Sequence, residues 1–217
     1  MKISVSYLGT KKITDTLREL DKTDVDYIHV DVMDGKYVKN KTMNFSDLKE
    51  IGYYTKKRLD IHFMVNKPLK YIDDYASLNA SYMSFHLDTK NSIEEIIKRT
   101  KMYGIKVGLV LNPDDNVELV FPYLEQIDLV LIMTVIPGLP GQKLIEDVIP
   151  KIYELKKEIK RQKLDVLVSV DGGINLDTKE LVKGVDIIVS GSCVTKSDNY
   201  QKIITKLREE IGNKNKK

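Results

Sequence analysis

Residues 27–35 read YIHVDVMDG, a β-branched run in which polar side chains alternate with apolar ones before a glycine turn. Seven other short apolar runs occur along the chain, most of them followed by a polar segment with helical spacing. We predict strands over residues 3–6, 27–32, 59–64, 82–86, 106–111, 129–134, 166–170 and 186–190. Helices are predicted over residues 13–20, 93–103, 145–161 and 200–211. Asn91 is the expected N-cap of the second helix, and Asp198 or Asn199 that of the fourth.

This alternation of strands and helices predicts an α/β fold in which the strands pair in parallel through right-handed crossovers. Eight such units in 217 residues favour a (β/α)8 TIM barrel near the lower size limit of that fold. An open doubly wound sheet is the alternative, but the turn at residues 4–9 is not its glycine-rich dinucleotide turn. Residues 1–217 are therefore expected to form a single barrel domain, with a short polar C-terminal tail from about residue 212.

Charge and composition exclude several classes of protein. The chain is 42% hydrophobic, and 35 basic residues against 32 acidic ones give a net charge of +3. This balance argues against a nucleic-acid or membrane-surface protein. A single cysteine, Cys193, precludes an intrachain disulfide and fits a reducing compartment. Because we find no signal peptide and no run long enough to span a membrane, we expect a cytoplasmic protein.

Ionisable side chains lie at the ends of several predicted strands, where a parallel barrel normally has apolar residues. They are His29, Asp31, His62, His86 and Asp171. Side chains two residues apart share a face of a strand, so His29 and Asp31 point the same way, about 7 Å apart. A lone strand histidine such as His86 is usually a core residue. The other four, however, would be costly to bury together without a partner, and a divalent metal is the simplest one. Mixed nitrogen and oxygen ligands suit zinc, iron, manganese or cobalt.

Methionines and glycines surround the same strand ends. Met33, Met64 and Met133 are either ordinary core or the apolar lining of a reactive site. Glycines that follow the sixth, seventh and eighth strands would allow backbone N–H groups to approach an anion, and barrels commonly bind phosphate there. These positions are Gly138, Gly141, Gly172, Gly173 and Gly191, the last followed by Ser192.

Six segments in this order resemble the signature segments of the ribulose-phosphate 3-epimerase family: HVDVMDG, IHFMV, VGLVLNP, LVLIMTVIPGLPGQ, VDGGIN and SGS. The resemblance extends from Ser4 to about Val194. It implies a (β/α)8 barrel that interconverts D-ribulose 5-phosphate and D-xylulose 5-phosphate in the pentose phosphate pathway. It also implies one divalent metal ion, with zinc favoured, a small-molecule sugar phosphate as partner and a homo-oligomeric assembly.

Carried over position by position, the resemblance implies that His29, Asp31, His62 and Asp171 bind the metal. Asp31 and Asp171 would also be the acid and base of a two-base proton transfer at carbon 3, through a 2,3-enediolate. The substrate contacts would be Ser4, His62, Gly138, Gly141, Gly172, Gly173, Gly191 and Ser192. The site would be lined by Met33, Met64, Met133 and His86.

The chain departs from the family pattern at a few positions. Ile3 stands where a proline is usual, GKYVKN at residues 35–40 where the family often has GHFVPN, and Asp88 where a glutamate is usual. Leu139 and Pro140 replace phenylalanine and glycine of the usual PGFGGQ, and Pro140 has no N–H to donate. An epimerase of a six-carbon sugar such as D-allulose 6-phosphate is thus one alternative, and a catalytically silent sugar-phosphate-binding barrel is another. A lyase or decarboxylase is a weaker one, because HVDVMDG and VSVDGG lack the lysine such barrels generally use.

Overall fold

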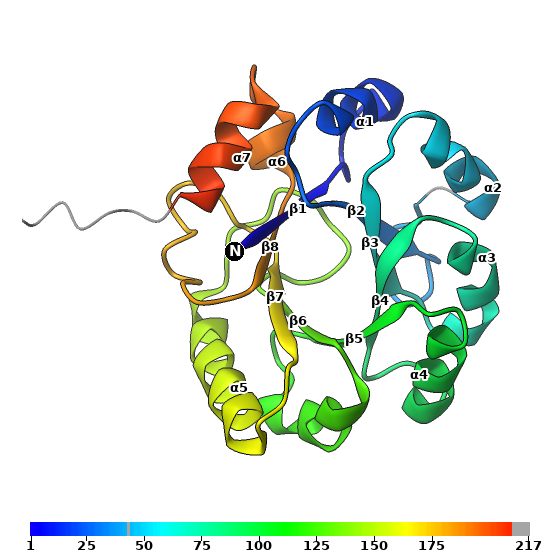
Figure 1. Cartoon of the computed structure of the whole chain (residues 1–217), viewed down its shortest axis with the longest axis vertical. Coiled ribbons are helices and arrows are strands. Elements are labelled where there is room, and N and C mark those ends of the chain that lie inside the picture. The colour runs from blue at the N-terminus through cyan, green and yellow to red at the C-terminus, as the bar shows by residue number, and fades with distance from the viewer. Residues whose placement is uncertain (43, 210–217) are drawn as a thin grey trace, which may run out of the picture.

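The computed structural model describes residues 1–42 and 44–209. Eight parallel strands close into a barrel in the order of the chain, and the last strand pairs with the first (Figure 1). The strands are β1 (Lys2–Ser6), β2 (Tyr27–Met33), β3 (Arg58–Met64), β4 (Ala80–His86), β5 (Lys106–Leu111), β6 (Leu129–Met133), β7 (Leu167–Asp171) and β8 (Ile187–Ser190). The (β/α)8 barrel and all eight predicted strands are confirmed, with ends that differ by at most two residues.

Helices surround the barrel (Figure 1). They are α1 (Ile13–Asp21), α2 (Phe45–Leu48), α3 (Ile72–Ala76), α4 (Ile93–Lys101), α5 (Ile149–Gln162), α6 (Ser192–Thr195) and α7 (Tyr200–Arg208). The prediction of Asn91 as the N-cap of α4 is wrong, because the Ser92 side chain accepts the hydrogen bond from the Glu95 N–H. Asn199 is the N-cap of α7, as predicted. The prediction that this helix continues beyond residue 208 is wrong at Glu209, which has an extended backbone. Residues 210–211 of that prediction, and the polar tail from about residue 212, lie outside the described residues.

Two of the crossovers are not α-helical. The β5–β6 connection is a 3-10 helix over Val117–Gln126, and Pro122 inside it lacks the N–H that an α-helix would use. The β7–β8 connection runs through turns over residues 174–185. The predicted helix over residues 145–161 begins later, because a 3-10 turn at Glu146–Val148 precedes α5. Both irregular crossovers belong to the half of the barrel whose loops carry the predicted glycines.

Each strand has one face toward the helices and one face toward the barrel interior. Outward side chains such as Val5 and Val30 pack with helix residues such as Leu17 and Leu155 in one large apolar core. Inward side chains on β1 to β4 are largely polar, although Met33 and Met64 are also inward. On the other side of the interior, an apolar cluster contains Val110, Leu131, Met133, Val135 and Val189. The polar part of the barrel interior therefore lies mainly along β1 to β4, and Asp171 of β7 joins it.

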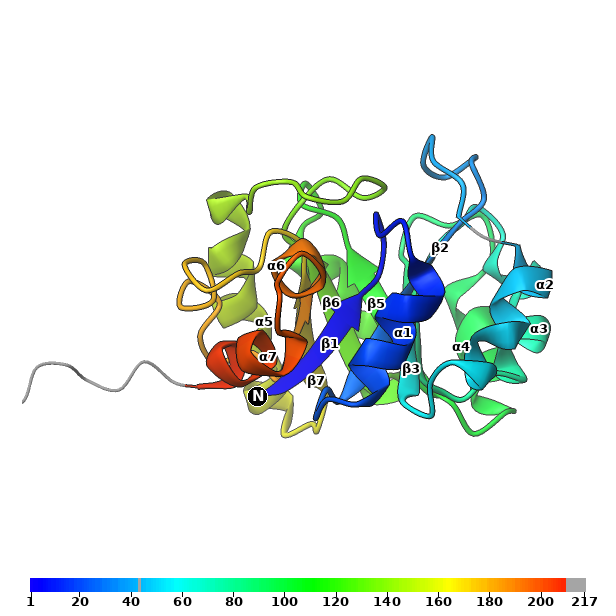
Figure 2. The same ribbon diagram turned by 90° about the horizontal axis from the view of Figure 1, so that it is seen from above.

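Three aspartates at the amino-terminal end of the barrel each link two neighbouring strands by the same pair of hydrogen bonds. Asp26, Asp128 and Asp186 each lie immediately before a strand, and each accepts a hydrogen bond from a backbone N–H of the preceding strand at 2.8–2.9 Å. Their own N–H groups donate to carbonyls of that same strand. These residues, named the aspartate clamps below, hold the end of the barrel opposite to the carboxyl ends of the strands. In Figure 2, β1 points away from this end, and the loop that follows β2 extends beyond the other one.

No helix in the described ranges is long and apolar enough to cross a membrane.

Replacing Asp128 by alanine should lower the free energy of unfolding by about 1–2 kcal/mol, because the Val107 N–H loses its charged acceptor in a partly buried place. Urea denaturation of both proteins measures the difference. Asp114→Ala, at an exposed aspartate in the loop after β5, is the matched control and should change the unfolding midpoint very little. Equal midpoints for the two variants would contradict the role given to the clamps.

Candidate active site

Four ionisable side chains meet inside the barrel near the carboxyl ends of β2, β3 and β7. Asp31 pairs in register with His62, and His29 lies two residues before Asp31 on the same inward face. Asp171 is the last residue of β7. One ligand atom from each of His29, Asp31, His62 and Asp171 lies within 4.8 Å of the others. The structure therefore brings together the whole set of predicted metal ligands.

The distances in this cluster fit a metal better than a set of hydrogen bonds. His29 Nε2 lies 3.4 Å from Asp31 Oδ1 and 3.5 Å from Asp171 Oδ2. His62 Nδ1 lies 3.5 Å and 3.6 Å from the same two oxygens. Within the described chain, neither nitrogen has a hydrogen-bond partner, although both are buried. Ligands about 2.1 Å from a tetrahedral zinc ion lie roughly 3.4 Å from one another, and the four nitrogen–oxygen distances are close to this value.

The remaining atoms of these side chains are held by close neighbours. His29 Nδ1 lies 2.9 Å from Asp60 Oδ2, and the Ser4 hydroxyl donates to the same oxygen at 2.9 Å. His62 Nε2 lies 2.9 Å from His86 Nε2. The sequence analysis missed Asp60, although it lies two residues before His62 and therefore on the same inward face of β3.

Ser6 was also missed. Its hydroxyl donates to Asp31 Oδ2 at 2.8 Å and accepts from the Leu8 N–H at 3.1 Å, and it lines the cavity described below. Ser4, the serine expected to contact substrate, is fully buried two residues earlier, beside Asp60. Both serines face inward on β1, so residue type and strand face alone do not distinguish them. The two serines differ in their depth in the barrel, because Ser6 lines the cavity and Ser4 lies below it.

The electrostatics of the cluster favour added positive charge. Burial disfavours the charged form of His29, yet the charges of Asp31 and Asp60 outweigh it and raise the pKa of this imidazole well above its ordinary value. The pKa of His62 is also raised, against its burial, by contacts with Asp171 and Asp31. Burial would raise the pKa values of the two carboxyls, but the imidazoles hold both below their usual range. A divalent cation would supply the charge that protonated imidazoles otherwise provide.

His86 differs from the other two histidines. Burial and the neighbouring His62 lower its pKa well below the ordinary value, so it is a neutral imidazole. Tyr37 covers it, with ring centroids 4.7 Å apart. The Tyr37 hydroxyl donates to Asp88 at 2.7 Å and accepts from the Asn112 side chain at 3.2 Å. His86 therefore contacts His62 rather than the cavity described below. Two departures from the family pattern, Tyr37 and Asp88, contact each other.

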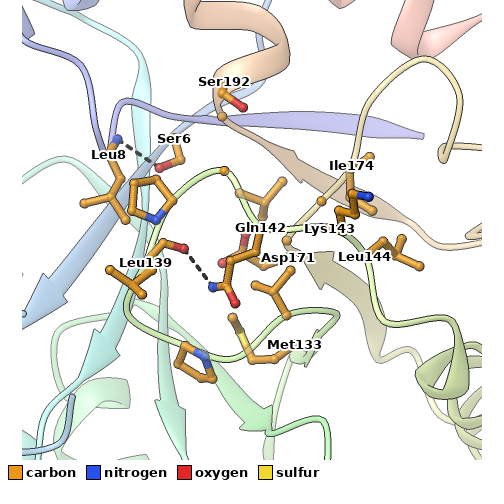
Figure 3. Close-up of a pocket in the computed structure, with 18 of the residues that line it drawn as sticks. Ser6, Leu8, Met133, Leu139, Gln142, Lys143, Leu144, Asp171, Ile174 and Ser192 are labelled. Carbon is orange, nitrogen blue, oxygen red and sulfur yellow. Dashed lines mark hydrogen bonds between the residues drawn. The ribbon is translucent and has the colours of Figure 1, made fainter. Parts of the chain in front are cut away.

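A cavity of about 560 Å³ lies above the cluster and opens at the carboxyl ends of the strands. Figure 3 shows Asp171 in this cavity, among side chains of the β6–α5 loop. All the methionines and glycines predicted for the site line it, together with Ser192: Met33, Met64, Met133, Gly138, Gly141, Gly172, Gly173 and Gly191. Among the described residues, its lining includes Asp31 and Asp171 but neither His29 nor His62. Of the four predicted ligands, the two carboxylates are thus the ones that a bound molecule can reach.

The β6–α5 loop is held over this cavity by contacts with other loops. The Asn40 side chain donates to the Gly138 carbonyl at 2.7 Å. The Gln142 side chain donates to the carbonyl of Leu139 at 2.9 Å, drawn as a dashed line in Figure 3. Pro140 packs against Gly9, where a β-carbon would lie only 3.0 Å from the proline ring. The unusual Pro140 thus has a packing partner in the loop after β1.

A model of the "Ribulose-phosphate 3 epimerase family" matches residues 2–195 of the chain. The chain belongs to this family. The ribulose-phosphate 3-epimerase of Bacillus subtilis (strain 168) is 37% identical over 195 residues, which cover 88% of this chain and 90% of that protein. Its counterpart in Buchnera aphidicola subsp. Baizongia pistaciae is 36% identical over 217 residues, with coverage of 98% and 95%. The chain is accordingly an isomerase, a sugar-phosphate 3-epimerase by family.

Solved structures with lower identity share the fold of this epimerase. The crystal structure of 3-hexulose-6-phosphate synthase from Salmonella typhimurium superposes with a TM-score of 0.63 at 20% identity, covering 95% of this chain and 96% of that one. At this level the likeness concerns the barrel alone. Membership of an epimerase family, by contrast, disfavours the lyase or decarboxylase alternative.

Gly173→Ala should destabilise the epimerase more than Gly184→Ala. Both glycines have positive φ, +69° and +92°, so alanine adds about 1–2 kcal/mol of backbone strain at either position. At Gly184 a β-carbon meets nothing within 4 Å, whereas at Gly173 it would collide with the backbone of Leu144 in the loop over the cavity. We expect a further loss of about 1–3 kcal/mol for Gly173→Ala, measured by urea denaturation. Equal losses in the two variants would refute the tight packing of these loops.

Proposed function

We propose that this epimerase interconverts D-ribulose 5-phosphate and D-xylulose 5-phosphate and depends on one divalent metal ion, with zinc favoured. The observation that carries the proposal is the buried cluster in which Asp31 and Asp171 face two imidazole nitrogens without hydrogen-bond partners in the described chain. The donor set of two imidazoles and two carboxylates suits zinc, and also iron, manganese or cobalt. His29, Asp31, His62 and Asp171 would hold the ion. As the family resemblance implies, we expect the reaction to serve the pentose phosphate pathway in the cytoplasm, with the chain assembled as a homo-oligomer.

Epimerisation next to a carbonyl requires that a proton leave one face of carbon 3 and return to the other. Asp31 and Asp171 come from strands β2 and β7 and both reach the cavity, so one can act as base while the other acts as acid. The Ser6 hydroxyl holds one oxygen of Asp31. A divalent ion at the cluster would supply positive charge that stabilises the 2,3-enediolate. The two carboxylates exchange roles when the reaction runs in the other direction.

The remaining cavity residues would position the sugar phosphate and keep water from carbon 3. Met33, Met64 and Met133 give the cavity an apolar lining near the carboxylates. On the side of β6 to β8, the glycines of three loops leave backbone N–H groups accessible to a phosphate. Anchoring the phosphate there would hold carbon 3 between Asp31 and Asp171.

The main alternative is a six-carbon substrate such as D-allulose 6-phosphate. Leu139 and Pro140 line the cavity and alter the loop over it relative to the family pattern, so the fit of each sugar has to be tested. Comparison of turnover of the two sugars decides between them. A silent sugar-phosphate-binding barrel would bind either sugar without turnover, and the complete set of ligands speaks against it.

The proposal predicts that the zinc-loaded protein in heavy water exchanges the proton on carbon 3 of D-ribulose 5-phosphate and forms D-xylulose 5-phosphate. NMR follows both events. Chelation should abolish them, and zinc should restore them, because the enediolate charge is otherwise not offset. Zinc at a hundred times its dissociation constant should also stabilise the fold by about 2.7 kcal/mol. Exchange that persists in fully chelated protein would refute metal dependence, whereas turnover confined to D-allulose 6-phosphate would replace the proposed substrate.

Asp171→Asn should lower the rate of epimerisation by at least a factor of about 100, because the amide can still accept hydrogen bonds but cannot take up a proton. If each carboxylate serves one face, proton exchange should be impaired more for one of the two sugars than for the other. Asp177→Asn, at an exposed position shortly after Asp171, is the control and should retain full activity. Near-normal epimerisation by Asp171→Asn would eliminate the two-base assignment.

A further inference from the structure

Asp60 is a buried carboxylate for which the proposed reaction has no role. It is 3% exposed, on the inward face of β3, directly opposite His29 in the β2–β3 ladder. The β3–β4 ladder shifts register between Leu59 and Asp60, so that Asp60 pairs with Tyr82. Such irregularities often re-aim a side chain next to a functional site. Because burying a carboxylate is costly, its placement calls for a partner.

Its partners determine which nitrogen of His29 carries a proton. A carboxylate only accepts hydrogen bonds, and Asp60 Oδ2 lies 2.9 Å from both the Ser4 hydroxyl and His29 Nδ1. The Nδ1 atom must therefore be the donor. In the neutral imidazole, the lone pair is then on Nε2, and Nε2 is the atom that faces Asp31 and Asp171. Asp60 thus selects the form of His29 that can bind a metal through Nε2.

His62 has a different kind of partner. Its Nε2 atom faces His86 Nε2, which can donate or accept depending on its own tautomer. The two imidazoles also present different nitrogens to the carboxylates, Nε2 of His29 and Nδ1 of His62. His29, unlike His62, therefore has a partner that can only accept, the Asp60 carboxylate. Ser4 on β1 holds this carboxylate by a hydrogen bond.

We propose that Asp60, held by Ser4, is a positioning residue that fixes His29 with Nε2 toward a divalent metal ion and thereby sets the affinity for that ion. This inference rests on the metal dependence proposed above. Loss of a hydrogen-bonding partner behind a metal-bound histidine typically weakens metal binding by about 10–100-fold. A purely structural role would instead change the stability of the fold and leave the metal affinity of the folded protein unchanged.

The test compares Asp60→Asn and Ser4→Ala with the unaltered full-length protein. The zinc dissociation constant of each metal-free protein is measured by competition with a chromophoric chelator at fixed pH, and thermal unfolding without metal reports stability separately. We expect Asp60→Asn to weaken zinc binding by about 10–100-fold and Ser4→Ala to weaken it by a smaller factor. Long-range proton–nitrogen NMR of the zinc-loaded protein should show His29 protonated on Nδ1 and a changed Nδ1 signal in Asp60→Asn.

Asp128→Asn is the matched control, because it alters an aspartate clamp at the opposite end of the barrel. It should lower stability while leaving the zinc dissociation constant unchanged. Wild-type zinc affinity in Asp60→Asn would overturn the inference and leave the proposed function intact. If Asp60→Asn does not fold, wild-type affinity in Ser4→Ala has the same meaning. Failure of the unaltered protein to bind any divalent ion would overturn the inference and the proposed metal dependence together.

Discussion

Closure of eight parallel strands directs every second side chain into one narrow interior, and the rest of the molecule depends on how that space is filled. On β5, β6 and β8 it is filled largely by apolar side chains. On β1 to β4 it contains imidazoles and carboxylates, which are tolerable there only in mutual contact. The contacts of Ser4, Asp60, His29 and Asp171 follow one another from the middle of the barrel to its mouth. The candidate metal site lies where this series of contacts reaches the carboxyl ends of the strands.

Much of this architecture could be predicted from the sequence. The strands could be predicted because buried parallel strands are short, β-branched and regularly interrupted. The four candidate ligands could be predicted because they are ionisable residues at strand ends. Positions that depend on depth or on local backbone geometry were not predictable in this way. Ser4 and Ser6 have the same residue type and share an inward face, but they lie beside different aspartates. Ser92 rather than Asn91 is the N-cap of α4, because the backbone places the serine oxygen near the Glu95 N–H.

Several residues that depart from the family pattern have specific contact partners in the structure. Tyr37 adds a hydroxyl to a ring that covers His86, and the shorter Asp88 accepts its hydrogen bond. Pro140 forms no backbone hydrogen bond through nitrogen, but it packs on Gly9, where a β-carbon would make a tight contact with the proline ring. These substitutions thus come with partners around an unaltered set of ligands. The epimerase chemistry can be retained while the loops above it change.

The aspartate clamps have a consequence for how such a barrel is assembled. Each clamp joins a strand to its immediate predecessor, across 18 to 23 residues of chain, and so closes within a single unit of two consecutive strands and their connection. Loops of this length are inexpensive in chain entropy, so these contacts can form before the β8–β1 seam closes the ring. Three strand pairs, β1–β2, β5–β6 and β7–β8, each contain an aspartate clamp that needs no other strand. The candidate metal site, whose residues come from β2, β3 and β7, forms only once these strand pairs have joined.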